Sequence, residues 1–104
     1  DGQLDWSRSA KELDRKIRAF TPWPGTFTFW HDRRLKILDA APLLDWQGSA
    51  PPGAVIDVEA GAAVATGDGA LRLEKVQLAG KRAMEIRPFL RGQRGFVGSR
   101  LGLD

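Results

Sequence analysis

Apolar residues first recur at helical spacing close to the N-terminus. The residues that share one face of this segment are Ala10, Leu13, Ile17 and Phe20. Ser9 precedes the segment and Glu12 follows three positions later, which is the sequence of a capping box. Pro22 biases the residue before it away from helical geometry. The pattern therefore predicts an amphipathic helix that begins after Ser9 and ends near Phe20.

Beyond Gly25 the apolar positions alternate with a period of two, as in half-buried strands. The five strands that this pattern predicts are residues 26–30, 33–40, 54–59, 62–66 and 70–78. The apolar parity switches within the last of them, which predicts a bulge at Glu74 and Lys75. A short helix is expected over residues 85–91, and the glycine-rich tail from Gly92 shows little regular patterning.

Short strands at close spacing, with helices only at the two ends, indicate a mainly β fold. The strand number fits a small OB-like antiparallel Greek-key barrel with an N-terminal amphipathic helix and a short C-terminal helix. The strand order does not follow from the pattern, so an SH3-like barrel stays open. The 104 residues suffice for one domain with one modest core.

Aromatic residues gather around the junction between the predicted helix and the first strand. Phe27 and Phe29 share one strand face and are expected in the core, whereas Trp30 points the opposite way and is the candidate for an exposed or interface position. Trp23 stands between two prolines and is expected to seal one end of the barrel rather than to stack on a base. Trp6 lies in a less regular segment, where interface packing is plausible.

The overall composition is that of an ordinary soluble domain, with 42% hydrophobic and 28% charged residues. The absence of cysteine excludes a disulfide framework and a thiolate metal site. No apolar run is long enough to cross a membrane, and the polar first residues do not form a signal peptide. The chain does not begin with methionine, so we expect it to be part of a longer protein.

The residues with catalytic potential do not form a recognisable site. His31 is the only histidine and lies in a predicted turn, away from any nucleophile that it could activate. Gly67, Asp68 and Gly69 predict a turn, since the helix N-terminus of a phosphate-binding loop does not follow them. We therefore expect neither a catalytic residue nor a metal site in this chain.

The basic residues are more informative, because they are grouped. The net charge of +3 is too small to establish a nucleic-acid partner by itself. Arginine side chains that project from one end of a barrel can pair with phosphates without reading sequence, although ordinary surface charge is the alternative for each group. The candidate RNA-binding residues, in order of preference, are Arg33, Arg34 and Lys36, then Lys81 and Arg82, then Arg15 and Arg18.

Several short motifs occur in an order that resembles the carboxy-terminal domain of the methionyl-tRNA formyltransferase family. They are LDWSRSA at 4–10, IRAF at 17–20, PWPG at 22–25, LKI at 35–37, Gly53, ATGDGAL at 65–71 and FLRG at 89–92. The first three are fairly specific, and together the motifs cover nearly the whole chain.

The resemblance implies an OB-like barrel that helps to hold tRNA by a basic surface. It further implies a parent enzyme that formylates methionyl initiator tRNA, with 10-formyltetrahydrofolate as cosubstrate. An amino-terminal Rossmann-like domain with an Asn-His-Asp set would be the catalytic part, and His31 does not match that set. We accordingly expect residues 1–20 to be the linker and helix that follow the catalytic domain, and residues 21–104 to be the barrel with its tail. The fragment itself is expected to bind no cofactor, and the parent to be monomeric and cytoplasmic.

A second hypothesis assigns the domain mainly a structural role. In that case it would be the C-terminal barrel of another formyltransferase, acting on a sugar nucleotide or on folate, and would chiefly pack on its own catalytic domain. The residues expected in such an interdomain contact are Trp6, Leu13, Ile17 and Phe20.

Overall fold

The first regular element is the predicted N-terminal helix. In the computed structural model, which describes residues 2–102, helix α1 spans Ala10–Phe20. The capping box is present: the Glu12 N–H donates to Ser9 Oγ and the Ser9 N–H donates to Glu12 Oε1, each at 3.1 Å. Leu13 and Ile17 are buried on the face that packs against the sheet. The capping box and the apolar spacing were thus sufficient to predict this helix.

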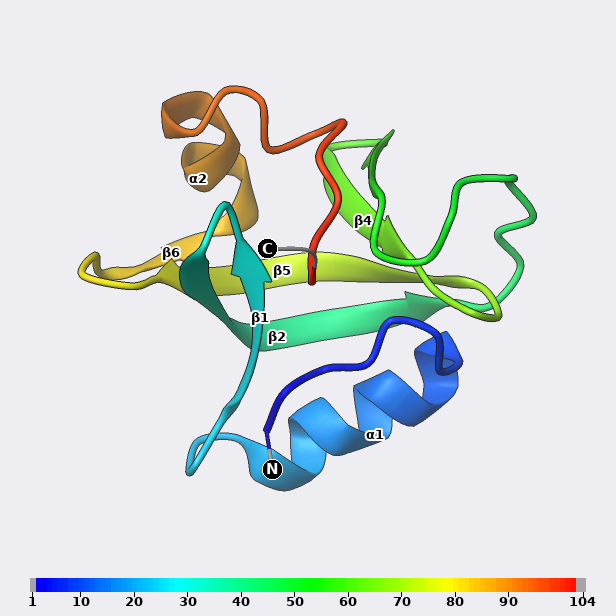
Figure 1. Cartoon of the computed structure of the whole chain (residues 1–104), viewed down its shortest axis with the longest axis horizontal. Coiled ribbons are helices and arrows are strands. Elements are labelled where there is room, and N and C mark those ends of the chain that lie inside the picture. Colours follow the sequence, from blue (N-terminus) through cyan, green and yellow to red (C-terminus); the bar gives the residue numbers. More distant parts are fainter. Residues whose placement is uncertain (1, 103–104) are drawn as a thin grey trace.

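The sheet has the strand order of a Greek key. Its strands are β1 (Thr26–Trp30), β2 (Arg33–Leu43), β3 (Val55–Val58), β4 (Gly61–Ala65), β5 (Ala70–Leu78) and β6 (Ala83–Glu85). These six strands pair with one another in antiparallel fashion, and the order is β1-β2-β5-β4-β3, with β6 also paired to β5. Three consecutive strands, β3 to β5, are joined directly, and β2 lies beside β5. The sheet curls into a small barrel-like domain, with α1 and α2 (Ile86–Gly92) on opposite sides of the β2–β5 pair (Figure 1).

Two strand predictions require correction. Strand β2 does not end at Ala40 but continues through Pro42, which pairs with Leu71. The proline has no N–H, yet the strand continues because the neighbouring residues still pair with β5. Strand β6 was not predicted, because three residues with a single half-buried side chain, that of Met84, give no readable alternation. The other strands and helix α2 agree with the predictions to within one residue at each end.

The predicted irregularity in β5 is confirmed. Asp39 pairs with Lys75 and Ala40 pairs with Leu73, so Glu74 is skipped in the register. A second shift skips Leu38 on the opposing strand. Because of these shifts, the apolar residues on both sides of the bulge point into the core, although their parity in the sequence changes.

The two faces of β1 are the reverse of those predicted. Thr26, Thr28 and Trp30 are buried, whereas Phe27 and Phe29 are only half-buried on the outer face. The inward threonines are satisfied by hydrogen bonds: Thr26 Oγ1 donates to the Ile37 carbonyl at 3.0 Å, and Thr28 Oγ1 accepts one from another buried side chain. Polar side chains can lie on the inner face of a strand when they have buried hydrogen-bond partners. The pattern of apolar positions in the sequence does not reveal such partners.

The core is completed by aromatic rings from three segments. Trp30 of β1 lies 6.4 Å from Phe89 of α2 and 5.2 Å from Phe96 of the tail, measured between ring centroids. The tail beyond α2 is held by backbone hydrogen bonds, such as that from the Val55 N–H to the Ser99 carbonyl at 2.9 Å. The segment without regular patterning is therefore an ordered part of the barrel.

The turn at Gly67 and Asp68 fastens the segment that precedes α1. The Gly67 N–H lies 3.0 Å from the carbonyl oxygens of both Trp6 and Arg8, and the Ala10 N–H donates to the Asp68 carbonyl at 2.9 Å. The turn prediction is correct, and the structure adds that this turn joins the start of the helix to the β4–β5 hairpin.

Candidate nucleic-acid interface

The β1–β2 hairpin presents three of the predicted RNA-binding residues. Its turn residues, His31 and Asp32, both have positive φ angles, of 49° and 66°. Two such residues form the kind of tight turn that matches the twist of paired strands. Arg33 and Arg34 follow directly and are exposed, and Lys36 is half-buried. The hairpin therefore projects its charges from one end of the barrel, as the sequence predicted.

Aromatic rings hold the two arginines against the sheet. The Arg34 guanidinium carbon lies 3.8 Å from the ring centroid of Phe27 and 6.0 Å from that of Phe29. The Arg33 guanidinium carbon lies 5.3 Å from the ring centroid of Trp30. Cations are attracted to the faces of aromatic rings, so these side chains are positioned although their charges face solvent.

The turn between β5 and β6 lies beside the hairpin. Lys36 is paired with Gln77, and the Ala79 N–H donates to the Arg34 carbonyl at 2.8 Å. A cavity of about 240 Å³ opens here between the two segments. It is lined by Arg34, Lys36, Gln77, Leu78, Ala79 and Gly80. Lys81 and Arg82 follow directly and are exposed. The structure thus brings the first and second groups of predicted basic residues together.

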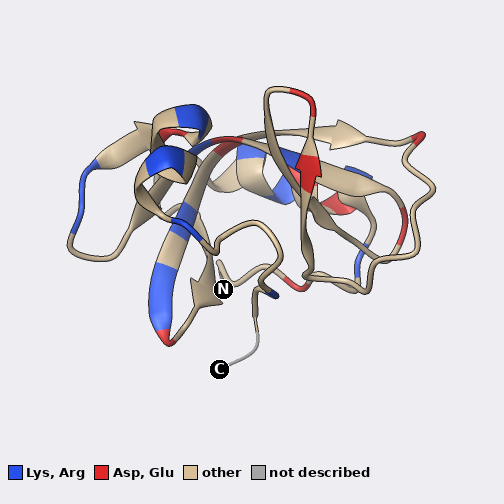
Figure 2. Cartoon of the chain, turned by 90° about the horizontal axis from the view of Figure 1, so that it is seen from above, with Lys and Arg blue, Asp and Glu red and all other residues tan. Residues whose placement is uncertain are grey.

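Helix α2 adds further cations to the same end of the molecule. Figure 2 shows basic residues on the β1–β2 hairpin, the β5–β6 turn and α2 at one end, while most acidic residues lie toward the other. Arg87 and Arg91 are exposed, are separated by one helical turn and line one shared cavity. The sequence analysis did not include them among the candidates, because the sequence does not reveal on which side of the barrel the helix packs.

The basic residues of α1 are not part of this end. Arg18 forms an ion pair with Asp14, at 3.1 Å between Nη2 and a carboxylate oxygen. Lys16 Nζ donates to the Gln3 carbonyl at 3.0 Å. Arg15 is exposed on the same helix, which packs on the other side of the β2–β5 pair from α2. The structure therefore separates Arg15 and Arg18 from the hairpin group.

The four residues expected in an interdomain contact have different positions. Trp6, Leu13 and Ile17 are buried in the core of this domain, with exposures of 5%, 2% and 2%. The indole Nε1 of Trp6 donates to Thr28 Oγ1 at 3.0 Å. These three side chains already have their partners within the barrel, so this part of the interdomain prediction is not supported. Phe20 is half-buried and keeps some exposed surface.

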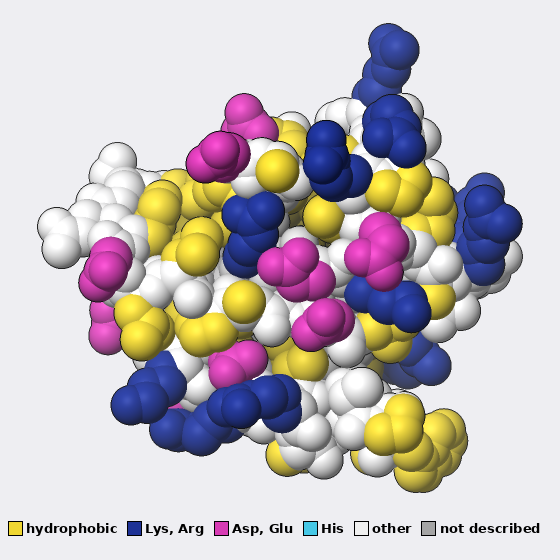
Figure 3. Space-filling view, turned by 180° about the vertical axis from the view of Figure 1, so that it is seen from behind, with side chains coloured by type: hydrophobic (Ala, Val, Ile, Leu, Met, Phe, Trp, Pro, Cys, Tyr) yellow, Lys and Arg dark blue, Asp and Glu magenta, His cyan; other side chains and the backbone are white. Residues whose placement is uncertain are grey.

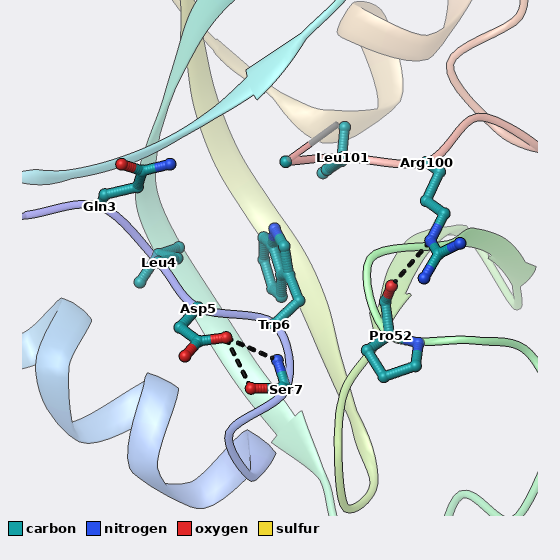
Figure 4. A pocket seen from close by; sticks show the side chains of 9 residues that line it. Gln3, Leu4, Asp5, Trp6, Ser7, Pro52, Arg100 and Leu101 are labelled. Atoms are coloured by element: carbon teal, nitrogen blue, oxygen red, sulfur yellow. Dashed lines mark hydrogen bonds between the residues drawn. The ribbon is translucent and has the colours of Figure 1, made fainter. Parts of the chain in front are cut away.

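A cavity of about 490 Å³ lies between the N-terminal segment and the C-terminal tail (Figure 4). The Asp5 carboxylate in its wall accepts hydrogen bonds from Ser7 Oγ at 2.7 Å and from the Ser7 N–H at 3.0 Å, and these bonds lower the pKa of Asp5. Arg100 Nε donates to the Pro52 carbonyl at 3.1 Å. Both charged groups are therefore engaged with neighbouring residues of the same domain.

Within residues 2–102, no group of three or more His, Asp or Glu side chains could hold a metal ion. In the same range, no helix is long and apolar enough to span a bilayer. His31 is exposed in its turn. The basic end, where exposed cations of the hairpin, the β5–β6 turn and α2 are grouped, is the candidate binding surface.

Comparison with known proteins agrees with the motifs in the sequence. The sequence model of the family described as "Formyl transferase, C-terminal domain" matches residues 1–94. The chain is 48% identical over 102 residues to methionyl-tRNA formyltransferase from Roseiflexus castenholzii and 49% identical over 102 residues to the protein of that name from Gluconacetobacter diazotrophicus. These matches cover 98% of the chain but only 33% and 32% of the relatives.

Solved structures share the fold. HypX from Aquifex aeolicus, crystallised in complex with tetrahydrofolic acid, superposes with a TM-score of 0.69 over 93% of this chain and 18% of HypX. A variant of the same protein gives a TM-score of 0.68 over 86% of this chain and 16% of that one. The sequence identity is 19% in both cases, so the likeness shows a common fold.

Proposed function

The chain belongs to the formyl transferase C-terminal domain family, and from this premise we propose that it is the tRNA-binding domain of a methionyl-tRNA formyltransferase. The parent enzyme would transfer a formyl group from 10-formyltetrahydrofolate to methionyl initiator tRNA during translation initiation. The names and the high identity of the relatives support this assignment. The chemistry and the binding of the folate would belong to the part of the relatives that this chain does not span.

The observation that carries the proposal is the joining of two basic segments at one end of the sheet. Arg33, Arg34 and Lys36 lie on the hairpin, and the β5–β6 turn beside it carries Lys81 and Arg82. Guanidinium groups match phosphate geometry with two parallel hydrogen bonds. A surface of this kind favours contact with an RNA backbone without reading its sequence.

The packing of arginine side chains on aromatic rings makes this surface better suited to binding phosphates. Arg34 is held over Phe27, so less side-chain entropy is lost when its guanidinium binds a phosphate. Arg15 and Arg18, which lie on the other side of the β2–β5 pair, rank lower in this proposal, and Arg18 has a carboxylate partner already. We further propose that the parent is monomeric and cytoplasmic, in keeping with a soluble tRNA substrate.

The competing function is a structural barrel of a formyltransferase for a sugar nucleotide or for folate. It requires an exposed apolar surface toward the catalytic domain and makes no use of grouped cations. The burial of Trp6, Leu13 and Ile17 within the domain removes most of the surface first assigned to that role. Grouped exposed arginines that pack on aromatic rings of the hairpin favour the tRNA-binding function.

The test is tRNA binding by the full-length protein at two salt concentrations. The logarithm of the affinity should fall with the logarithm of salt by about 0.7–0.9 for each phosphate neutralised. Replacement of Arg33 and Arg34 together by alanine should weaken binding similarly for different tRNAs and flatten this slope by about two. The control is Arg8→Ala with Lys11→Ala, which removes the same charge at the start of α1. Equal effects of the two double variants would contradict the proposal.

A further inference from the structure

Trp23 is the most exposed large apolar residue among residues 2–102, with 83% of its surface accessible. The prediction that it seals the barrel is therefore wrong. The loop that carries it is nevertheless well held: the Gly25 N–H donates to the Phe20 carbonyl at 2.8 Å, and prolines on both sides of Trp23 restrict the backbone. A rigid loop thus presents a large indole to solvent.

Further apolar groups surround this indole. Pro22 and Pro24 are exposed beside Trp23, and Phe20 at the end of α1 is half-buried. The name Trp23 patch is used below for Phe20, Pro22, Trp23 and Pro24. In the view from behind, hydrophobic side chains protrude at the lower right, where the α1–β1 connection lies (Figure 3). Exposed apolar clusters of this kind mark surfaces that other macromolecules cover.

The first described residues run directly alongside this loop. The Phe27 N–H donates to the Gly2 carbonyl at 2.9 Å, and the Leu4 N–H donates to the Phe27 carbonyl at 2.9 Å. A Cβ atom placed on Gly2 would lie 2.5 Å from the carbonyl oxygen of Gly25, so the two backbones are in close contact. Any polypeptide that precedes residue 1 must therefore leave the barrel beside the Trp23 patch (Figure 1).

The charges around the patch favour a protein partner over RNA. Lys16 donates to the Gln3 carbonyl and lies 5.6 Å from the ring centroid of Phe20, and Arg18 is paired with Asp14. These cations are thus engaged within the domain. The patch lies at the start of β1, and the turn of the basic hairpin follows the other end of this strand.

We propose that the Trp23 patch is the docking surface for the domain that precedes residue 1 in the parent protein. The matched relatives are about three times as long as the chain, since it covers 33% of one and 32% of another, and the matching family is a C-terminal domain. A large aromatic side chain such as tryptophan buries about 150–250 Å² when it is covered and is a common anchor residue of interfaces. The inference rests on the proposed function only in requiring a parent with such an upstream domain.

Hydroxyl-radical footprinting of the full-length protein, without RNA, tests this docking. If nothing covers it, Trp23 will be oxidised fastest of the four tryptophans of this chain, since Trp6 and Trp30 are buried and Trp46 is half-buried. Docking predicts the opposite order, with Trp23 oxidised several-fold more slowly than Trp46. A Trp23→Ser variant of the full-length protein should also increase the radius of gyration and the protease cleavage of the segment that joins the upstream domain to this one. Leu44→Ala, at another exposed apolar side chain, should change neither quantity.

Three outcomes would overturn the docking. Trp23 could be the fastest-oxidised tryptophan, it could be protected only after tRNA is added, or it could be protected only at high protein concentration. The second outcome would assign the patch to RNA and the third to a second copy of the chain. Because docking is measured without RNA, its failure is distinguishable from a failure of tRNA binding.

Discussion

The guanidinium group of Arg34 lies over the ring of Phe27, with 3.8 Å between the guanidinium carbon and the ring centroid. The two residues come from adjacent strands, where Phe27 is paired with Lys36 and Phe29 with Arg34. The outer face of the β1–β2 hairpin therefore combines aromatic rings with cations. The ring of Phe27 thus determines where the guanidinium group of Arg34 is held. One exposed cation–π contact of this type contributes about 0.5–1 kcal/mol of interaction free energy.

Loss of the Phe27 ring should weaken tRNA binding although no charge is removed. For Phe27→Leu in the full-length protein we expect an affinity about two- to fivefold lower, the equivalent of one exposed cation–π contact. The salt dependence should stay unchanged, because the number of cations is unchanged. Phe29→Leu is the matched control, since the Arg34 guanidinium lies farther away, at 6.0 Å. A flatter salt slope for Phe27→Leu would show that the ring does more than position Arg34.

The sequence was most informative where local rules determine the structure. The capping box of Ser9 and Glu12, the turn at His31 and Asp32 and the bulge at Glu74 depend on neighbours in the sequence, and all three are present. Charge grouping in the sequence selected the hairpin and the β5–β6 turn as candidates, and the strand pairing places these two segments side by side. That they bind RNA stays a prediction.

Where long-range packing decides the outcome, the sequence was misleading. The alternation of residues in β1 does not specify which face of the strand is buried. Thr28 lies on the inner face, where Trp6 from a distant segment donates a hydrogen bond to its hydroxyl. Trp23, between two prolines, was expected to seal one end of the barrel, yet its side chain is exposed. Whether an aromatic residue is core or surface depended here on partners that are far away in the sequence.

The hydrogen bond between Trp6 and Thr28 should be important for stability. Thr28→Val preserves the shape but leaves the buried Trp6 Nε1–H without its acceptor, so we expect a loss of about 1–3 kcal/mol in the free energy of unfolding. Urea denaturation measures this loss. Adding Trp6→Phe removes the unsatisfied donor, so the double variant should lose less stability than the sum of the two single variants. Additive losses would show that the two side chains are not coupled.

The turn that fastens the N-terminal segment should not tolerate a side chain at Gly67. A Cβ atom there would overlap the carbonyl oxygen of Ser7, and the shift needed would strain the hydrogen bonds from Gly67 to Trp6 and Arg8. We expect Gly67→Ala to cost about 2–3 kcal/mol of unfolding free energy. Gly92→Ala is the matched control, because nothing lies within 4 Å of a Cβ atom at that position. Equal stability of the two variants would contradict the role of the turn.

The capping box should make the stability of α1 depend on pH. The bonds from the Ser9 backbone N–H and then the Ser9 hydroxyl hold the pKa of Glu12 below its ordinary value of 4.5. Because the folded pKa is lower than the unfolded one, the ionised Glu12 stabilises the folded state. This contribution is complete above the ordinary value and is lost as the pH falls through the lowered folded value.

Thermal melts of the wild type and of Glu12→Gln between pH 7 and pH 3 measure this contribution. The pKa of Asp5 is also lowered, but this group is present in both proteins, so the difference in melting temperature isolates Glu12. We expect the difference to be largest near neutral pH and to shrink as Glu12 becomes protonated. Ser9→Ala, which removes the N-cap, should cost about 1 kcal/mol at pH 7. In the Ser9→Ala background Glu12→Gln should have a smaller effect, since one of its bonds is missing. A difference between wild type and Glu12→Gln that is independent of pH would mean that the carboxylate does not stabilise the helix.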